Sequence, residues 1–399
     1  MNQLDFLKEN VPCYIYDGEA VTKQCRKLKK AFSGFDILYS IKTNPFPDII
    51  KAVSKEGLGA DVASSGEVEL AAENGIAPEN IFYSSPGKTD WDIGKCYGKC
   101  VLIADSQTEI MRINKTAARR GEIAEIGLRV NPDFSMEDEQ GCPSKFGIDA
   151  ELLLKEKTFF TEYSNIRIVG IHIHIKSQIL DAGILAKYYQ KCFALAKKIH
   201  EMEGVNIKFI NFGSGIGALY REDVDQPIDL KKLSCTASYI SKENAETLNA
   251  RLLMETGRFI VCNAGKYYTR IVDIKESMGE KYLIVENGMN GFMRPAIANL
   301  LLKAAGKSLP GYEPLYTCQD EFSVRVLNQE KQKEKVHIVG NLCTALDSIC
   351  ENVEISRTRI GDIIEITNAG SYGYSLSPVL FSSQALAGQY CLLSGDKNI

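Results

Sequence analysis

The sequence predicts an α/β fold: a (β/α)8 barrel of the TIM type, followed by a β-rich barrel or sandwich domain. Three observations support this expectation. Eight β-rich runs alternate with helical segments over about 220 residues, which matches the strand count and length of such a barrel. After Gly257 the alternation stops, and strand-like runs follow one another with few convincing helices between them. At 399 residues the chain also exceeds one ordinary core, so two domains are expected.

The expected barrel strands are short and rich in β-branched and aromatic residues. They cover residues 37–42, 59–62, 81–84, 101–104, 125–131, 168–174, 207–212 and 252–255. A first helix is expected at 20–32, and the clearest helices between the strands cover 48–55, 66–73, 107–119 and 183–203. An open doubly wound sheet is the structural alternative, but that fold does not require eight strands.

The second domain is expected to take its strands from residues 267–274, 281–285, 322–326, 336–339, 353–355 and 362–367. A strand around Tyr14 is expected to complete it. The boundaries that follow are 27–260 for the barrel and 1–26 plus 261–399 for the β-domain. The acidic and polar stretch 133–142 is expected to form a long loop, which is either a lid or a disordered segment.

Composition and charge exclude several classes of protein. An apolar content of 45% and a charged content of 25% are typical of soluble globular proteins. A net charge of −4 argues against nucleic acid or an anionic membrane as the main partner. We see no signal peptide and no apolar stretch of the roughly 20 residues that a membrane helix needs, so a cytoplasmic protein is expected.

Cysteine and histidine usage points away from disulfides and metals. The twelve cysteines are scattered without a CxxC pair, and we interpret them as reduced thiols. The four histidines are too few and too dispersed for an obvious zinc site, so no metal is expected.

The first expected barrel strand ends at Lys42, in the stretch LYSIKTNP. A lysine at the rim of a barrel can point into the cavity above the sheet. Its amine could condense with an aldehyde to form a Schiff base if burial lowers its pKa. Most single lysines are solvated surface charges, so this interpretation depends on partners elsewhere in the chain.

Further reactive side chains follow other strands at the same rim, where the active sites of such barrels lie. Asp61 is at the end of the second strand, and His174 and Ser177 follow the sixth. His174 is either a satisfied core histidine or an imidazole that stacks on a cofactor ring.

The seventh and eighth strands lead into a glycine-rich turn and an acid–arginine pair. In Gly213-Ser214-Gly215, glycines let backbone N–H groups approach a phosphate, although a simple tight turn explains them equally well. Glu255 and Arg258 flank Gly257 and could form a structural ion pair. Alternatively, Arg258 binds a phosphate in a bidentate manner, and Glu255 bonds a pyridine nitrogen and keeps it protonated as an electron sink.

The β-domain adds two candidates. Cys343 lies in GNLCTALD, after a strand, although most cysteines are inert core residues. Tyr372 lies between glycines in NAGSYGYS, where it either reaches a phosphate or forms an exposed turn.

Taken together, these motifs resemble the fold-type III pyridoxal 5'-phosphate (PLP)-dependent amino-acid decarboxylases, the family of diaminopimelate, ornithine and arginine decarboxylases. The resemblance runs from about Pro12 to Phe381. Its motifs, in the order of the family, are LYSIKTNP, GADVASSGE, SSPGK, GIHIHIKSQ, NFGSGIG, ETGR, VGNLCTALD and NAGSYGYS.

The resemblance implies a role for each candidate. Lys42 would be the Schiff-base lysine, His174 would stack on the ring, and Glu255 would face the pyridine nitrogen. The remaining cofactor-binding positions, several of them at the phosphate, would be Asp61, Ser177, Gly213, Ser214, Gly215, Gly257, Arg258 and Tyr372. Cys343 of the partner subunit would protonate the substrate carbon, which implies a homodimer with shared active sites. Alanine racemases have an arginine where this chain has Glu255, so the resemblance favours decarboxylation.

The resemblance is less specific about the substrate. Arg294 matches the arginine that grips the distal carboxylate in diaminopimelate decarboxylases, but Ala298 replaces their tyrosine and Thr344 replaces their glutamate. Asp347 resembles an aspartate of ornithine decarboxylases, and the pattern around Cys343 also resembles siderophore and aminoglycoside decarboxylases. The default expectation is conversion of meso-diaminopimelate to lysine and CO2. The alternatives are a larger or carrier-linked amino acid, with a carrier protein as partner, a polyamine-type ornithine or lysine decarboxylase, and a non-catalytic PLP-binding regulator.

Overall fold

The computed structural model describes residues 3–156, 160, 162–202, 205–213, 215–305 and 322–392. The chain forms two compact units. The barrel unit comprises Lys23–Gly217 and Pro227–Gly257, and the β-rich unit comprises Met1–Thr22, Ala218–Gln226 and Arg258–Ile399. The expected domain boundaries at 26/27 and 260/261 stay a prediction. The two compact units are divided a few residues earlier in the sequence, and the segment 218–226 belongs to the β-rich unit.

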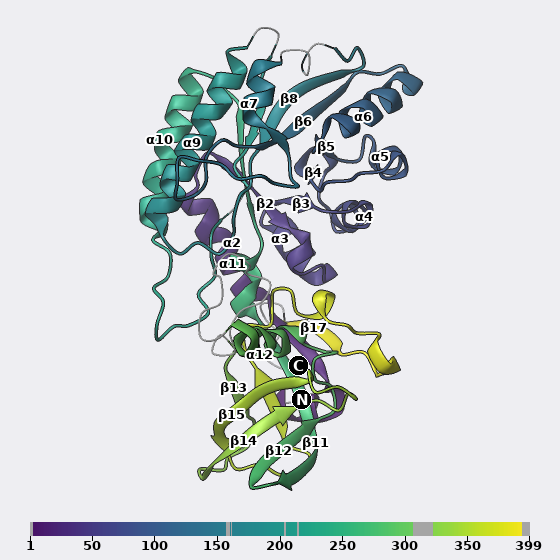
Figure 1. Ribbon diagram of the computed structural model, residues 1–399, viewed down its shortest axis with the longest axis vertical. Helices are drawn as coiled ribbons and strands as arrows, with labels where there is room; N and C mark the ends of the chain where they lie inside the picture. The colour runs from purple at the N-terminus through teal and green to yellow at the C-terminus, as the bar shows by residue number, and fades with distance from the viewer. Residues whose placement is uncertain are drawn as a thin grey trace. The chain divides into compact units, whose positions relative to one another are not determined.

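Eight parallel strands close into a barrel in the first unit (Figure 1). Neighbouring strands pair in the order β5-β4-β3-β2-β10-β9-β8-β6, and pairing of β5 with β6 closes the ring. The strands are β2 (Phe35–Ser40), β3 (Gly59–Val62), β4 (Ile81–Tyr83), β5 (Val101–Ala104), β6 (Ala124–Asn131), β8 (Ile166–His172), β9 (Phe209–Asn211) and β10 (Arg251–Thr256). The predicted (β/α)8 barrel is therefore confirmed. The short strand β7 (Ile148–Asp149) pairs only with β6, beyond the ring.

Helices surround the barrel, and α9 and α10 lie side by side on its outside (Figure 1). They are α2 (Gly18–Ala31), α3 (Pro47–Lys55), α4 (Ser65–Glu73), α5 (Asp90–Cys96), α6 (Gln107–Arg120), α7 (Ala150–Lys155), α9 (Ala182–His200) and α10 (Leu230–Glu246). Alternation of strand and helix keeps all strands parallel, so their carboxyl ends meet at one rim. The expected long loop spans residues 132–147, between β6 and β7.

The barrel interior is a packed apolar core centred on Phe209. Its ring lies 5.4 Å from the ring of Phe82, centroid to centroid, and a cluster of buried aliphatic side chains surrounds the pair. Gly170 makes room for this ring, because a Cβ at that position would lie only 2.2 Å from its Cζ atom. The filled interior leaves the loops at the strand ends as the place for chemistry.

The β-rich unit is built on a mixed sheet in the order β13-β16-β11-β12-β14-β15. Strand β1 pairs antiparallel with β11 and parallel with β17, so the two ends of the chain meet in this sheet (Figure 1). The expectation that the N-terminal strand completes the unit is confirmed. Its strands are β1 (Cys13–Asp17), β11 (Gly265–Ser277), β12 (Glu280–Val285), β13 (Val324–Val326), β14 (Lys333–Val339), β15 (Ser348–Ser356), β16 (Ile363–Ile366) and β17 (Gly388–Leu392).

Three helices of the β-rich unit are α1 (Gln3–Asn10), α11 (Arg258–Val261) and α12 (Met293–Ala305). Helix α12 was not among the expected elements, although its sequence MRPAIANLLLKAA is rich in the strong helix formers alanine and leucine. Pro295 sits in its first turn, where a proline does not interrupt helical hydrogen bonds. None of the helices within the described ranges combines the length and apolar character that crossing a bilayer requires.

Candidate active site at the carboxyl rim of the barrel

Lys42 lies in a tight turn just beyond strand β2. The strand ends at Ser40, and Ile41–Thr43 form one turn of 3-10 helix. The strand therefore begins and ends two residues earlier than the expected 37–42, and a 3-10 turn takes the place of its last two residues. The hydroxyl of Tyr39 donates to the carbonyl of Asn44 (2.9 Å) and holds this turn closed.

The amine of Lys42 faces a buried carboxylate. Its Nζ atom lies 3.3 Å from Oδ2 of Asp61, and the hydroxyl of Ser84 donates to Oδ1 at 2.9 Å. The side chain of Asp61 is 2% exposed, whereas the side chain of Lys42 is 47% exposed. The side chain of Lys42 is thus not buried, and the contact with Asp61 sets the environment of its amine. Asp61 and Ser84 hold the amine in place while it remains open to a small molecule.

His174 lies in the loop after β8, which ends at His172 rather than at the expected residue 174. Its Nε2 atom is 3.3 Å from the hydroxyl of Ser177, as expected for two residues of one site. Burial of the imidazole lowers its pKa to about 3. The negative charge of Glu255 opposes this decrease, and the positive charges of Arg129 and Lys42 contribute to it. The ring is therefore neutral at physiological pH and suited to stacking rather than to carrying charge.

Glu255 meets two polar side chains from the neighbouring strand ends. Its Oε1 atom accepts a hydrogen bond from Nδ2 of Asn211 (2.8 Å) and lies 3.1 Å from Nε2 of His172. Burial alone would raise the pKa of Glu255, but the contact with His172 lowers it, and the net pKa lies well below its ordinary value. Glu255 is thus a buried, ionised acceptor.

Three glycines let the backbone pass close to the strand ends. Gly213 has a φ of +61°, and a Cβ there would lie 2.5 Å from the carbonyl oxygen of Ile173. A Cβ on Gly257 would lie 2.0 Å from Oγ1 of Thr43. Gly215 also has a positive φ, and Ser214 between these glycines lies outside the described residues. The turn has the backbone freedom that a phosphate cradle needs.

The β-rich unit holds a second cluster of candidates around Tyr220. Both Nη1 of Arg258 (2.9 Å) and Nη2 of Arg294 (3.2 Å) donate to the hydroxyl of Tyr220. The guanidinium of Arg258 also lies 5.0 Å from the ring centre of Tyr372, and Nη1 of Arg294 donates to the carbonyl of Ser371 at 3.1 Å. The predicted phosphate residues Arg258 and Tyr372 are thus in contact with each other.

The predicted substrate residues have different surroundings. Cys343 is exposed, and Thr344 is half-buried in the same loop. Asp347 is buried, and its two carboxylate oxygens accept the N–H groups of Met289 (2.7 Å) and Leu342 (2.9 Å). We interpret Asp347 as a residue that stabilises the conformation of this loop, because both of its oxygens accept hydrogen bonds from backbone N–H groups.

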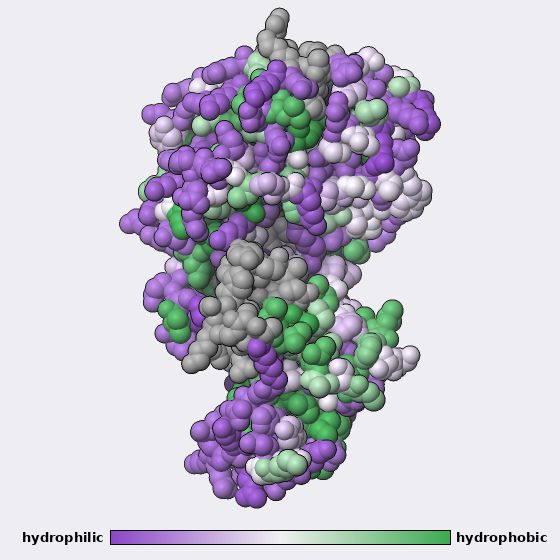
Figure 2. Space-filling model, viewed as in Figure 1, coloured by the Kyte–Doolittle hydropathy of each residue, from purple (hydrophilic) through white to green (hydrophobic). Residues whose placement is uncertain are grey.

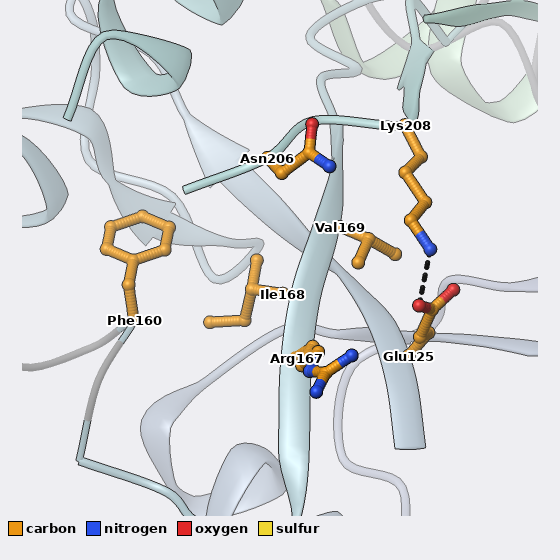
Figure 3. A pocket seen from close by; sticks show the side chains of 7 residues that line it. All are labelled: Glu125, Phe160, Arg167, Ile168, Val169, Asn206 and Lys208. Atoms are coloured by element: carbon orange, nitrogen blue, oxygen red, sulfur yellow. Dashed lines mark hydrogen bonds and ion pairs between the residues drawn. The ribbon is translucent and has the colours of Figure 1, made fainter. Parts of the chain in front are cut away.

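A cavity of about 320 Å³ is lined by residues at the amino ends of the barrel strands, away from the rim that carries Lys42. Figure 3 shows the side chains that line it. Glu125 and Arg167 line it near the start of β6 and β8, and Lys208 precedes β9. Lys208 forms an ion pair with Glu125 (Figure 3). Barrel enzymes react at the carboxyl ends of their strands, so this cavity is at the wrong end for catalysis.

The sequence analysis assigned no role to the contact residues Ser84, His172 and Tyr220. A signal existed for the first two, because each polar side chain follows or ends a buried strand of an otherwise apolar barrel. Tyr220 gave no such signal, since it follows the glycine turn in an irregular segment.

Comparison with known proteins identifies the class. The family model "Pyridoxal-dependent decarboxylase, pyridoxal binding domain" matches residues 19–262. The chain belongs to this family, and it is a PLP-dependent carboxy-lyase.

Individual relatives agree with this assignment. The chain is similar to the diaminopimelate decarboxylase of Aquifex aeolicus, with 30% identity over 92% of this chain and 83% of that protein. It is also similar to the L-glutamyl-(BtrI acyl-carrier protein) decarboxylase of Niallia circulans, with 29% identity over 93% of this chain and 86% of that protein. Among solved structures, the diaminopimelate decarboxylase of Helicobacter pylori complexed with L-lysine has a TM-score of 0.81 and 25% identity, covering 96% of this chain and 92% of that one.

The residues at the barrel rim fit PLP. An accessible amine at Lys42, a glycine turn that a Cβ would obstruct at Gly213, and an ionised buried carboxylate at Glu255 match its aldehyde, phosphate and ring nitrogen.

Proposed function

We propose that the protein decarboxylates an amino acid of the diaminopimelate type, with meso-diaminopimelate to lysine and CO2 as its default reaction. The observation that carries the proposal is the rim of the barrel unit. There, the amine of Lys42 lies 3.3 Å from Asp61, and the ionised Glu255 lies at the end of β10, the strand that pairs with β2.

Each residue would have a distinct task. Lys42 would hold the cofactor through its amine, and the neutral imidazole of His174 would stack on its ring. Glu255 would accept a hydrogen bond from the ring nitrogen and keep it protonated. Bound PLP supplies the electron sink that a decarboxylation needs.

The phosphate would be held by the backbone of the glycine turn, including Gly213 and Gly215, together with Arg258 and Tyr372. The contact between Arg258 and Tyr372 supports a shared task for these two residues. Asp61, Ser177, Ser214 and Gly257 would complete the cofactor site. In the default reaction, Arg294 and Thr344 would contact the substrate.

We infer a cytoplasmic homodimer in which Cys343 of the partner subunit delivers a proton to the substrate carbon. The exposed position of Cys343 in a loop supports this role, because a proton donor for another subunit must be accessible.

A carrier-linked amino acid is the second candidate substrate, and the surroundings of Arg294 favour it. Arg294 is fully buried, and its guanidinium already donates hydrogen bonds to Tyr220 and Ser371 within the protein. Position 298 carries alanine and offers no phenol to a distal carboxylate. The related decarboxylase from Niallia circulans is named for a glutamyl substrate on an acyl-carrier protein.

The test is product mass after incubation of the PLP-loaded protein with single substrates. The panel contains meso-diaminopimelate, lysine, ornithine, arginine and a glutamyl thioester of phosphopantetheine. Lysine from meso-diaminopimelate supports the default reaction, and turnover of the thioester alone supports the carrier-linked one. Lys42→Ala is expected to abolish turnover, whereas Lys51→Ala, an exposed lysine nearby on α3, is expected to retain it. Turnover of none of these substrates would contradict the proposal.

A further inference from the structure

Three polar side chains from neighbouring barrel strands form a buried triad. His172 ends β8 and pairs in register with Asn211, which ends β9. Glu255 lies near the end of β10, the next strand of the ring. All three residues are at most 3% exposed, so their contacts are shielded from water.

The contacts of Glu255 are unevenly divided between its two oxygens. Asn211 and His172 both approach Oε1, at 2.8 and 3.1 Å. Within the described part of the chain, no hydrogen bond or ion pair is found for Oε2. A carboxylate terminus rotates easily between two equivalent positions, and two partners on one oxygen fix it in one of them. One oxygen is therefore engaged by the protein, and the other is left for a ligand.

We propose that His172 is a positioning residue which, with Asn211, engages Oε1 of Glu255 and reserves Oε2 for the ring nitrogen of bound PLP. This inference rests on the proposed function, in which Glu255 faces that nitrogen. His172 acts through Glu255 and does not touch the cofactor itself.

The surroundings of His172 support a role directed at Glu255. Its imidazole is 1% exposed, and neither ring nitrogen meets the geometry of a hydrogen bond among the described residues. Nε2 nevertheless lies 3.1 Å from Oε1 of Glu255, which is the charged group that this buried polar ring approaches. The same contact keeps Glu255 ionised against the effect of burial.

The triad also reaches the glycine turn. Oδ1 of Asn211 accepts the N–H of Gly213 at 2.9 Å, and the N–H of Glu255 donates to the carbonyl of Gly213 at 2.8 Å. One network thus sets both the carboxylate for the ring nitrogen and the turn for the phosphate. Loss of His172 would leave the carboxylate of Glu255 less firmly oriented, whereas the glycine turn would keep its hydrogen bonds to Asn211 and Glu255.

The test compares His172→Phe, which removes the imidazole nitrogens, with His172→Gln, which keeps a donor of shorter reach. His337→Phe is the matched control, because His337 also lies 3.1 Å from a glutamate, Glu280, but on the sheet of the β-rich unit. The first readout is the pKa of Glu255 in the cofactor-free protein, followed by carbon NMR of carboxyl-labelled glutamate and assigned with Glu255→Gln. The second is the visible absorption of bound PLP as a function of pH.

In His172→Phe, we expect the pKa of Glu255 to rise, because burial then acts without the contact with His172 that opposes it. We expect the absorption of bound PLP to change its pH dependence, and kcat to fall by roughly tenfold to a hundredfold with a smaller change in KM, as for loss of one charged hydrogen bond. His172→Gln is expected to recover part of each effect, and His337→Phe to leave all three unchanged.

The two failures are distinguishable. An unchanged Glu255 titration and PLP spectrum in folded His172→Phe or His172→Gln, with normal cofactor binding and turnover in the wild type, would overturn the role of His172 alone. Absence of PLP binding or decarboxylation in the wild type would instead overturn the proposed function. If His172→Phe does not fold, His172→Gln decides the question.

Discussion

At the scale of single residues, the neutral state of His174 makes a prediction about acid stability. Its imidazole has a pKa of about 3 in the folded protein, against an ordinary value of 6.5. Between these values the unfolded chain binds a proton that the folded protein does not. This residue therefore makes the free energy of unfolding fall as the pH falls from about 6.5 towards 3, by at most about 1.4 kcal/mol per pH unit.

Replacing His174 by glutamine removes this contribution. We expect His174→Gln to lose less stability than the wild type between pH 7 and pH 5, where most carboxylates remain ionised in both proteins. The measurement is the urea midpoint of the cofactor-free proteins at several pH values. Parallel curves for the two proteins would contradict a low pKa for His174.

The sequence predicted the chemistry of the site better than its contacts. Lys42 and Asp61 were expected at one rim, and the structure brings them together because parallel strands end on the same side. The hydrogen bond from Ser84 to Asp61 depends on the exact register of β3 and β4, which periodicity does not reveal. The substrate role of Asp347 stays a prediction, and the sequence pattern did not reveal that both of its oxygens accept backbone N–H groups.

At the scale of elements, the close packing of the turn after β9 predicts the effect of adding a single methyl group at Gly213. In Gly213→Ala, the added Cβ would lie 2.5 Å from a backbone carbonyl oxygen, at a φ of +61° that side chains rarely adopt. We expect this variant to lose about 1–3 kcal/mol of stability and to bind PLP at least tenfold more weakly.

A second glycine provides the control. Gly94 lies within α5, where a Cβ would meet nothing within 4 Å. Gly94→Ala is expected to leave PLP binding unchanged and to stabilise the protein by about 0.5–1 kcal/mol through helix propensity. Thermal unfolding and a spectroscopic PLP titration measure both effects. Equal PLP affinity of Gly213→Ala and the wild type would show that the turn is not a phosphate cradle.

The elements themselves were largely predictable, because each barrel strand is an apolar run bounded by turn residues. The ends of strands were not. Strand β2 stops at Ser40 and β8 at His172, where the backbone turns to meet other loops rather than where the β-rich sequence ends. Helix α12 was missed because its first residues match a substrate motif, although its composition favours a helix.

At the scale of the whole molecule, the β-rich unit carries exposed apolar side chains that suit a subunit interface. Leu380 is 82% exposed, Phe381 is 48% exposed, and Leu346, in the loop of Cys343, is 44% exposed. Figure 2 shows hydrophobic surface on the β-rich unit. Exposed apolar side chains are often covered at interaction surfaces. The proposed homodimer would cover such groups and bring Cys343 to the site of the partner.

A shared site predicts complementation between two inactive variants. Lys42→Ala lacks the cofactor lysine, and Cys343→Ala lacks the proton donor, so each homodimer is expected to be inactive. If each site combines Lys42 of one subunit with Cys343 of the other, every mixed dimer has one intact site. Random reassociation of equal amounts should then restore about a quarter of the wild-type activity, since half of the dimers are mixed and each uses one of two sites. Mixtures prepared without subunit exchange are the control and should stay inactive. Lack of recovery in dimers shown by native mass spectrometry to be mixed would place both residues in the same subunit's site.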